Sequence, residues 1–455
     1  MTLDRAKEHI TRIYIYVMLG LYPLFTGFRG YGDITAAKLA FFLAVTLVWA
    51  AGLVLLSIRD KDYFPGKVGA VDIILLIYVL FCCISAALSP FRGSVLLGAG
   101  RFDGLAGTAL GVLIFFGVSR YAKPERGYVY ALAVGVLGCC VVAVGQFMGG
   151  NPLRLFPGDF TYYGKGIQYS GEFLGTIGNA NLFSAYLALA LPVVLGGCLV
   201  GIRGWLVGDW ESDLGAGFEG KRRWDWMFLL PVFLLGAYCL FRCTVSAGKL
   251  GLLCALALGP LFVLKTKKAR LLFLGALGGA AAIGLILIYN FPPGEGTLFE
   301  LSRVLHGEFH DSFGSSRIRI WRDCLELVRQ RPLFGGGSGT ATLRLDIDFS
   351  RFVPETGKTL TASVDNAHNV YLGILTDTGA FALLAYLAAI GFTVWDGMKR
   401  GGAEGQDPRG GAGTILIIGL IAYWVQDFFG LGLFIVSPLM WVIWGLSESG
   451  ATAPQ

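Results

Sequence analysis

Residues 36–57 read AAKLAFFLAVTLVWAAGLVLLS, an apolar run in which Lys38 is the one charged side chain. A membrane-spanning helix needs roughly 20 predominantly apolar residues, so this stretch alone predicts a helix that crosses a bilayer. The rest of the chain has the same character, because 55% of its residues are hydrophobic, 15% are charged and the mean hydropathy is +0.64. This composition is typical of an integral membrane protein and not of a soluble fold.

Eleven further segments resemble this run, and together they predict an all-α polytopic membrane protein with about 12 transmembrane helices. The twelve lie near residues 13–28, 36–57, 69–88, 104–119, 127–148, 179–201, 226–241, 248–264, 271–289, 370–395, 411–426 and 429–446. The last two could instead form one hairpin that enters the membrane part-way. Residues 1–289 would then hold helices one to nine, residues 290–367 one large loop with amphipathic helices, and residues 368–455 helices ten to twelve with a tail.

The basic residues predict the orientation of these helices. With the N-terminus in the cytoplasm, the cytoplasmic segments hold 20 lysines and arginines, whereas the short connections on the other side hold 8. Short cytoplasmic loops are enriched in lysine and arginine, so both termini and the tail are predicted to be cytoplasmic and residues 290–367 to be extracytoplasmic. A long water-facing loop is where functional residues concentrate.

Charge within residues 290–367 is nearly balanced, with nine basic and ten acidic residues. A general polyanion-binding surface would be strongly basic, so no nucleic-acid partner is predicted. His306 and His310 lie four residues apart with acidic neighbours, and a helix could bring them together on a divalent metal. A third ligand is not evident in the sequence, so no metal site is predicted there.

Residues 315–329 predict a capped amphipathic helix that ends before Pro332. Its apolar arc is formed by Ile320, Trp321, Cys324, Leu325, Leu327 and Val328. Arg317 falls inside this arc, whereas Arg319 lies on the polar face, so Arg317 is the stronger candidate for a site residue. The structural alternative is that Arg317 reaches the surface along its alkyl chain or pairs with a carboxylate.

Two further features follow this helix. Residues 332–340, PLFGGGSGT, form a glycine-rich turn whose amides could line a phosphate or which could simply be flexible. Residues 368–379, HNVYLGILTDTG, then lead into a predicted span. At helical spacing His368 shares a face with Leu372, Leu375 and Gly379. Gly379 would permit close contact with a neighbouring helix on that face. Asp377 is predicted to point elsewhere. His368 is a candidate catalytic residue, and a structural histidine or helix cap is the alternative.

A transporter or flippase for a lipid-linked substrate would also need about a dozen helices. Such proteins usually carry ionisable residues near the membrane midplane and paired repeats. Here the predicted span centres are almost free of ionisable residues, and Asp72, Asp396 and Asp427 lie towards span ends. The sequence therefore favours an enzyme, with the transporter as the competing class.

The order of the motifs resembles the O-antigen ligase family of bacterial membrane glycan transferases. The motifs are Arg317 with Trp321, then Pro332 and the turn at Gly335, then His368 and Asn369 with Gly379. Residues 175–186, GTIGNANLFSAY, are similar to the family's Asn-x-Asn helix start, and residues 101–104, RFDG, to its outer-loop Arg-x-x-Gly element. Residues 242–249, RCTVSAGK, stand where the family often carries Ser-Arg-Gly.

The resemblance implies a metal-independent glycosyltransferase, without a cofactor, in the bacterial cytoplasmic (inner) membrane and acting on its extracytoplasmic face. Such enzymes move a glycan from undecaprenyl pyrophosphate to a hydroxyl on lipid A core, another glycan such as a cell-wall glycan, or a protein. His368 looks like the family's essential base and Arg317 like an arginine at the pyrophosphate. The residues expected to bind the substrate are Arg101, Arg242, Lys249, Asn369 and Arg319.

One further position bears on the type of transfer. Ala382 stands where ligases of the family often carry glycine, threonine or tyrosine. An O-antigen or polysaccharide polymerase of the same family therefore stays an alternative to a ligase. The identity of the sugar, the acceptor and the oligomeric state are left open by the sequence.

Overall fold

The computed structural model describes residues 2–60, 68–157, 162, 171–207, 224–311, 313–345, 348–353, 358–364, 366–402 and 410–449. The first helices are α1 (Leu3–Tyr16), α2 (Ile34–Asp60), α3 (Ala70–Leu88), α4 (Leu105–Tyr121), α5 (Arg126–Phe147), α6 (Ala180–Val207) and α7 (Asp225–Arg242). The later helices are α8 (Ala247–Leu258), α9 (Pro260–Val263), α10 (Lys267–Asn290), α11 (Thr297–Leu305), α12 (Phe313–Gln330), α13 (Val370–Gly402), α14 (Gly410–Asp427) and α15 (Ser437–Glu448).

Strands and short helices make up little of the described chain. β1 (Phe173–Leu174) pairs with β2 (Gly178–Asn179), and β3 (Asp348–Val353) pairs with β4 (Lys358–Ser363), both antiparallel. The short helices are a π turn, η1 (Val17–Leu21), and the 3-10 turns η2 (Tyr22–Leu24), η3 (Gly30–Gly32) and η4 (Ala341–Leu343). The predicted all-α class is confirmed.

Seven described helices are long and apolar enough to cross a membrane, namely α2, α3, α5, α6, α7, α10 and α13. The apolar helices α4, α8 with α9, and α14 are shorter. The chain is therefore a multi-pass membrane protein. Helical structure covers at least part of each of the twelve predicted segments, although the last segment becomes helical only at Ser437. The count of twelve spans stays a prediction, because α1 and α15 meet neither description.

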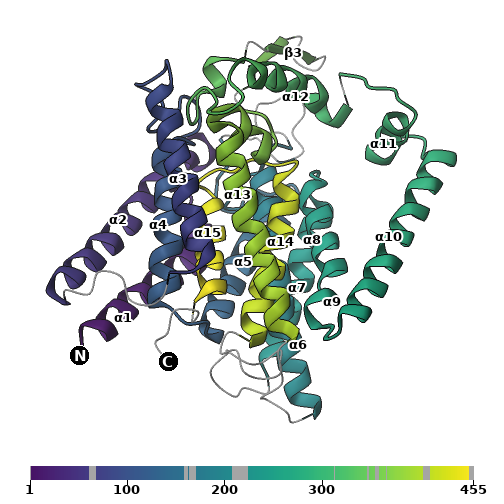
Figure 1. Ribbon diagram of the computed structural model, residues 1–455. Helices are drawn as coiled ribbons and strands as arrows, with labels where there is room; N and C mark the ends of the chain where they lie inside the picture. The colour runs from purple at the N-terminus through teal and green to yellow at the C-terminus, as the bar shows by residue number, and fades with distance from the viewer. Residues whose placement is uncertain are drawn as a thin grey trace.

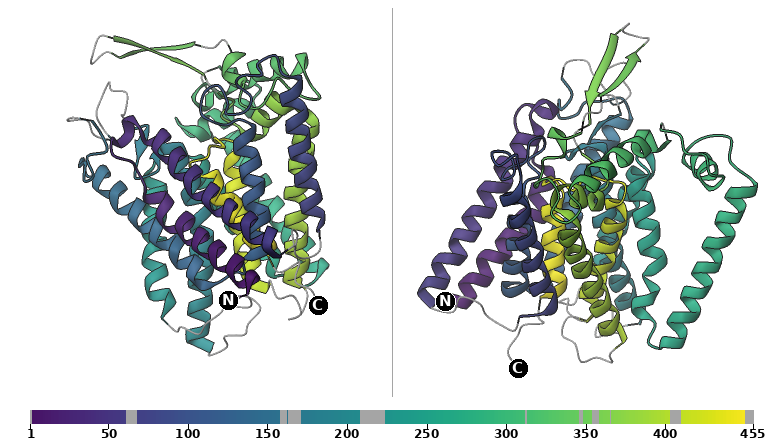
Figure 2. Two further views of the ribbon diagram at one scale, coloured as in Figure 1. Left: turned by 90° about the vertical axis from the view of Figure 1, so that its left-hand side faces the viewer. Right: turned by 45° about the horizontal axis from the view of Figure 1, so that its top comes forward.

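The helices form a bundle in which α13 packs against α3 and α14, α14 packs against α6 and α8, and α15 packs against α4. Figure 1 shows both chain ends at one end of this bundle and α11, α12 and β3 at the opposite end. Figure 2 shows the hairpin of β3 and β4 projecting from that opposite end. The described parts of the predicted loop therefore gather at the end that faces away from the termini.

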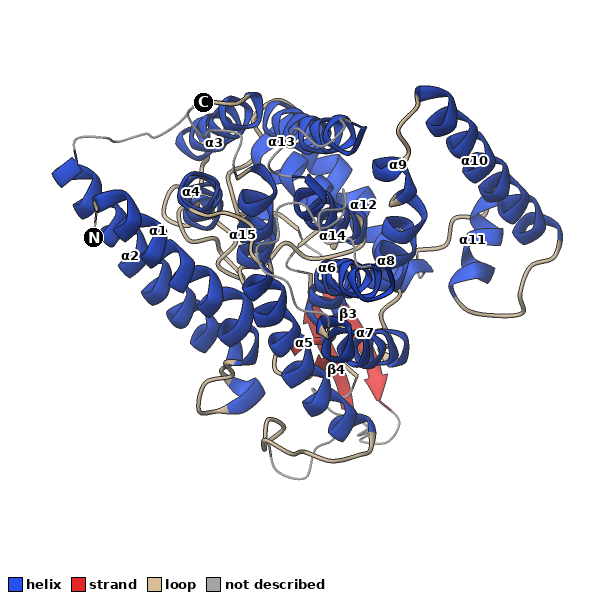
Figure 3. Ribbon diagram, turned by 90° about the horizontal axis from the view of Figure 1, so that it is seen from below, coloured by secondary structure: helices blue, strands red, loops and turns tan. Residues whose placement is uncertain are grey.

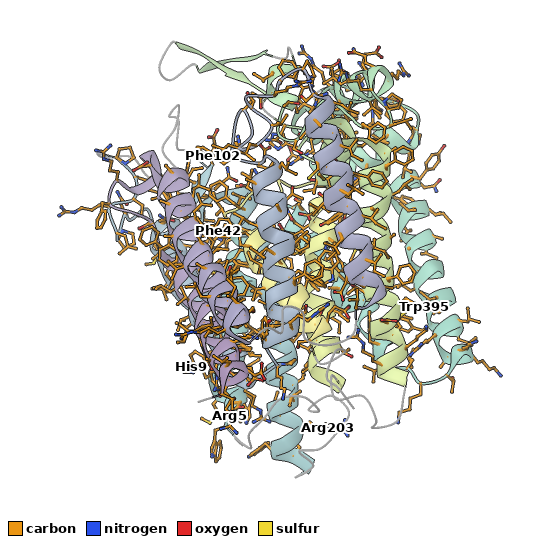
Figure 4. All side chains as sticks on the ribbon, turned by 60° about the vertical axis from the view of Figure 1, so that its left-hand side comes forward. Arg5, His9, Phe42, Phe102, Arg203 and Trp395 are labelled. Atoms are coloured by element: carbon orange, nitrogen blue, oxygen red, sulfur yellow. The ribbon has the colours of Figure 1, made fainter. Side chains whose placement is uncertain are left out.

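The end that holds the termini is rich in charge. Buried ion pairs join α3 to α4 through Asp72 and Arg120 (2.5 Å) and α13 to α15 through Arg400 and Glu448 (2.7 Å). Figure 4 places Arg5, His9 and Arg203 at this end too. Paired or surface-exposed charges are what a helix bundle can carry where it leaves the membrane.

Lys38, the charged residue in the apolar run that predicts α2, compensates for a break in the first helix. The helical segment that begins with α1 continues through η1 and ends with the 3-10 turn η2 at Leu24, and Pro23 has no amide hydrogen with which to continue the helical hydrogen bonds. The Lys38 ammonium donates to the carbonyls of Tyr22 (3.1 Å) and Pro23 (3.2 Å), and the Thr176 hydroxyl also donates to the Pro23 carbonyl (2.9 Å). Backbone groups inside a membrane protein need such partners because lipid offers none.

Helix α10 stands apart from the bundle. None of its residues is buried, and Figure 3 shows α10 and α11 outside the packed helices. Its contacts are near its two ends, where Arg270 donates to the carbonyl of Met398 (2.7 Å) and the Tyr289 ring stacks on His306 with centroids 4.0 Å apart. An apolar helix with all faces exposed suits a lipid environment.

Helix α13 is kinked where Gly379 adopts φ 85°, a conformation that L residues rarely adopt. The backbone of Leu333 from the glycine-rich turn lies against Gly379, and the amide of Ala380 donates to the carbonyl of Pro332 (2.9 Å). Gly379 was predicted to permit contact with a neighbouring helix. That interpretation is wrong, because the turn rather than a helix occupies the space beside it.

Replacing Gly379 by alanine is therefore expected to destabilise the protein. A Cβ at this position would clash with the Leu333 carbonyl and would force a side chain into the left-handed region. We expect a loss of at least about 2 kcal/mol in the free energy of unfolding, measured by denaturant titration in detergent micelles. Gly391→Ala on the same helix is the matched control, because nothing lies within 4 Å of its added Cβ. Equal stability of the two variants would contradict the role assigned to the kink.

Candidate active site

A cavity of about 180 Å³ lies between α4, α13, α14, α15 and the glycine-rich turn. Its lining includes Phe42 and Phe102, which Figure 4 places away from Arg5 and Arg203 and so towards the end that carries α12. Parts of the chain that are distant in sequence therefore meet here. A concave pocket with convergent polar groups is the usual form of a small-molecule site.

His368 and Asn369 line this cavity. His368 precedes α13 and has φ 48°, and its backbone amide donates to the Asn366 side chain (2.9 Å). The Asn369 side chain accepts from the amide of Leu372 (3.0 Å) and so caps α13. The cap is thus Asn369 rather than His368. The backbone of His368 is not helical. The helical wheel that predicted a shared face for His368 and Leu372 therefore does not apply to His368.

Asp377 lines the same cavity, which corrects the prediction that it points elsewhere. Its carboxylate accepts from the Arg344 guanidinium (2.5 Å) and from the amide of Gly339 (3.0 Å). The prediction was wrong because it projected His368 and Asp377 onto one continuous helix. A non-helical His368 removes the angular relation between the two side chains.

The glycine-rich turn is fixed to α13. Residues 335–340 are all buried, and the amides of Gly336 and Gly337 donate to the carbonyls of Thr376 (3.2 Å) and Asp377 (2.8 Å). Together with the bond from Gly339 to Asp377, these contacts occupy amides that were considered as phosphate ligands. The turn is therefore neither a flexible connection nor an open phosphate-binding loop.

Helix α12 covers the segment that precedes His368. Ile320 and Cys324 are buried in a small apolar cluster that includes Ala367, and the Trp321 indole donates to the Ala367 carbonyl (3.0 Å). The predicted apolar arc is thus largely confirmed. Leu325 is an exception, because its side chain is 49% exposed.

Arg317 lies in α12 and is partly buried. Its guanidinium donates to the carbonyls of Gly314 (2.7 Å) and Phe429 (3.3 Å), the second of which follows α14. Burial lowers the pKa of Arg317 below its usual value, although the negative charge of Glu300 opposes this shift. One structural alternative for Arg317 was an ion pair with a carboxylate. The hydrogen bonds of its guanidinium go to backbone carbonyl groups instead.

The other predicted substrate-binding residues lie on several elements. Arg101 lies in the connection to α4, which is joined to the turn by the amide of Ala99 donating to the carbonyl of Gly339 (2.8 Å). Arg242 ends α7 with its guanidinium over the Phe147 ring (5.8 Å), Lys249 lies in the first turn of α8, and Arg319 is partly exposed on α12. Like Arg317, these four are not among the described residues that line the cavity.

The cavity is also lined by residues that the sequence analysis did not select as site residues. They are Asp103, Ser338, Asp377, Tyr423 and Asp427. Asp427 is 1% exposed at the end of α14. An aspartate at the end of an apolar span is a sign of a candidate site residue in the sequence. The sequence does not reveal, however, that Asp427 faces this cavity.

Comparison with known proteins finds a family model that matches part of the chain. The sequence model of that family, described as O-antigen ligase, matches residues 231–387. The matched range includes Arg317, the glycine-rich turn and His368. No curated protein matches the chain.

Removing Arg344 should destabilise the site, because it leaves the Asp377 carboxylate buried without its cation. We expect Arg344→Ala to lower the free energy of unfolding by about 3 kcal/mol, and addition of Asp377→Asn to recover part of that loss. Denaturant titration in micelles would measure both. Arg329→Ala is the control, because Arg329 is exposed and pairs with Glu326 on the surface of α12. A loss in the Arg329 variant as large as that in the Arg344 variant would contradict this assignment.

Proposed function

Because residues 231–387 belong to the O-antigen ligase family, we propose that the protein moves a glycan from undecaprenyl pyrophosphate to an acceptor hydroxyl. The family supports a glycan ligase or polymerase function in a membrane. The observation that carries the more specific proposal is the position of His368 in the cavity at the end of the bundle covered by α12. We assign His368 as the general base and Arg317 as a ligand of the pyrophosphate.

The reaction needs a base and a cation but no metal. The acceptor oxygen attacks the anomeric carbon of the donor glycan, a new carbon–oxygen bond forms, and the bond to the pyrophosphate breaks with its electron pair. His368 takes the proton of the acceptor hydroxyl, a step typically worth about 10² to 10⁴ in rate. The leaving undecaprenyl pyrophosphate gains negative charge, which guanidinium groups stabilise through charge-assisted hydrogen bonds.

The local structure supports the role of His368. Its left-handed backbone is stabilised by Asn366, and Asn369 fixes the start of α13 beside it. Non-glycine residues with positive φ cluster at functional sites because such a conformation directs a side chain at a cost in stability. The imidazole is thereby positioned before substrate arrives.

Arg317 has the charge and surroundings that a pyrophosphate ligand needs. It contacts two carbonyl groups, and among the described residues its Nε has no hydrogen-bond partner. A partly buried guanidinium that is not paired with a carboxylate can offer its charge to a phosphate. Arg101, Arg242, Lys249 and Arg319 remain proposed secondary contacts.

We further propose that the end with α12 is extracytoplasmic and that both termini are cytoplasmic, in the inner membrane of a bacterium. The predicted excess of lysine and arginine on one side and the common end of the termini in Figure 1 support this orientation. Residues 290–367 would then form the extracytoplasmic loop. The lipid-linked donor and lipid A core, which both carry lipid chains, could reach α12 from the membrane. A cell-wall glycan or a protein acceptor could reach it from the water.

Transfer should depend on His368 and Arg317. Purified protein in nanodiscs is given undecaprenyl-pyrophosphate-linked glycan and candidate acceptors, and product is followed by gel shift and mass. We expect His368→Ala and Arg317→Ala to lower the rate at least about 100-fold, and a chelator to leave wild-type transfer unchanged.

Matched controls come from the same region. Arg322→Ala changes an exposed arginine of α12 that pairs with Asp311, and His310→Ala changes a histidine whose ring meets the Phe313 ring edge to face. Both should retain near wild-type transfer. Undiminished transfer by folded His368→Ala would refute the assignment of the base, and no transfer from any lipid-linked donor would favour the transporter class.

A further inference from the structure

The cavity beside His368 is unsuited to the pyrophosphate of the donor. Asp103, Asp377 and Asp427 line it, and no lysine or arginine is among its described lining residues. Arg344 offsets the charge of Asp377 from outside this lining. A pyrophosphate placed here would meet no lysine or arginine among these lining residues, and an anion without a cation in a poorly solvated site is strongly disfavoured.

Buried polar atoms in the lining lack partners. Within the described part of the chain, the hydroxyls of Ser338 and Tyr423 and one carboxyl oxygen of Asp427 make no hydrogen bond. The three residues are 3%, 1% and 1% exposed, respectively. Leaving a buried polar group without a partner costs free energy, so several such groups around one cavity indicate a polar ligand.

The volume and the lining residues of the cavity suit one sugar ring. A volume of about 180 Å³ corresponds to about six water molecules at roughly 30 Å³ each. Aromatic side chains, including Tyr78, Phe102 and Trp441, supply apolar walls, and hydroxyl, carboxyl and amide groups supply hydrogen bonds. An uncharged sugar presents hydroxyls at its rim and C–H groups on its faces, which matches this mixture.

We propose that this cavity binds the acceptor, through an uncharged sugar residue whose hydroxyl faces His368, and that the donor pyrophosphate stays outside at Arg317. The inference rests on the proposed function. Ser338, Tyr423 and Asp427 bind hydroxyls of the acceptor sugar. The donor sugar is the poorer occupant, because it is bonded directly to the pyrophosphate and would bring that charge into a cavity whose described lining holds no lysine or arginine.

Separate binding of the two substrates predicts a split in the kinetic constants. Tyr423→Phe and Ser338→Ala should each raise the KM for a glycan acceptor about 3- to 10-fold, and Asp427→Asn about 10-fold or more, because each removes or weakens a hydrogen bond to the ligand. The donor KM should change less than about twofold. Arg317→Lys should show the opposite pattern, since lysine cannot form the two-pronged contact.

Tyr186→Phe is the matched control for Tyr423→Phe. The Tyr186 hydroxyl is also buried without a hydrogen-bond partner in the described structure, but Tyr186 is not among the described residues that line the cavity. Its removal should leave both KM values unchanged. A rise in donor KM with unchanged acceptor KM in the Tyr423, Ser338 and Asp427 variants would overturn the assignment.

A binding experiment tests the cavity without turnover. The probes are inorganic pyrophosphate and, separately, glucose, galactose and N-acetylglucosamine, each added to the protein in nanodiscs while its unfolding temperature is measured. At least one sugar should stabilise wild type and Arg317→Ala but not Asp427→Asn. Pyrophosphate should stabilise wild type and Asp427→Asn but not Arg317→Ala.

The outcomes separate this inference from the proposed function. Sugar stabilisation that depends on Asp427, in a protein that transfers nothing, would refute the transferase and still support a sugar site. No stabilisation of wild type by any of the three sugars, or loss of pyrophosphate stabilisation in Asp427→Asn, would overturn the cavity assignment.

Discussion

The backbone contact between the glycine-rich turn and the kink of α13 is the constraint on which the candidate site depends. Gly379 leaves the space that Leu333 fills, and the kinked helix offers the carbonyls of Thr376 and Asp377 to amides of the turn. Arg344 and Gly339 then hold the Asp377 carboxylate. The turn, the first part of α13 and one wall of the cavity are therefore a single unit, and a side chain at residue 379 would disturb all three.

The polar groups around the candidate site fit the proposal that the two substrates of a transfer reaction bind separately. The cavity holds aspartates and hydroxyl groups, whereas Arg317 lies in α12 and donates to the carbonyl of Phe429. His368 lies between α12, whose Trp321 binds the carbonyl of Ala367, and the cavity that it lines. Under the proposed function, the imidazole at the edge of this cavity would meet the acceptor there, while the phosphate of the donor stays at Arg317.

The membrane environment accounts for the features that support this site. Lys38 and Thr176 supply the hydrogen bonds that a broken first helix would otherwise lack. At the end that holds the termini, buried pairs such as Asp72 with Arg120 join neighbouring helices. Helix α10 has no buried residue and attaches through contacts near its ends. The packed part of the bundle thus carries the cavity, while α10 is left to lipid.

The sequence by itself determined the membrane class, the positions of most helices, the amphipathic helix around Arg317 and the adjacency of His368 and Asn369, because hydropathy and helical period are local properties. The motifs at residues 242–249, Arg317, the glycine-rich turn and His368 also lie within the range that the family model matches. Only the tertiary structure decided that Asp377 faces the cavity, that Leu325 is exposed and that the turn rather than a helix fills the space at Gly379. Those outcomes depend on two positive φ angles, at His368 and Gly379, and on contacts between distant segments, and neither is encoded in the spacing of residues along one helix.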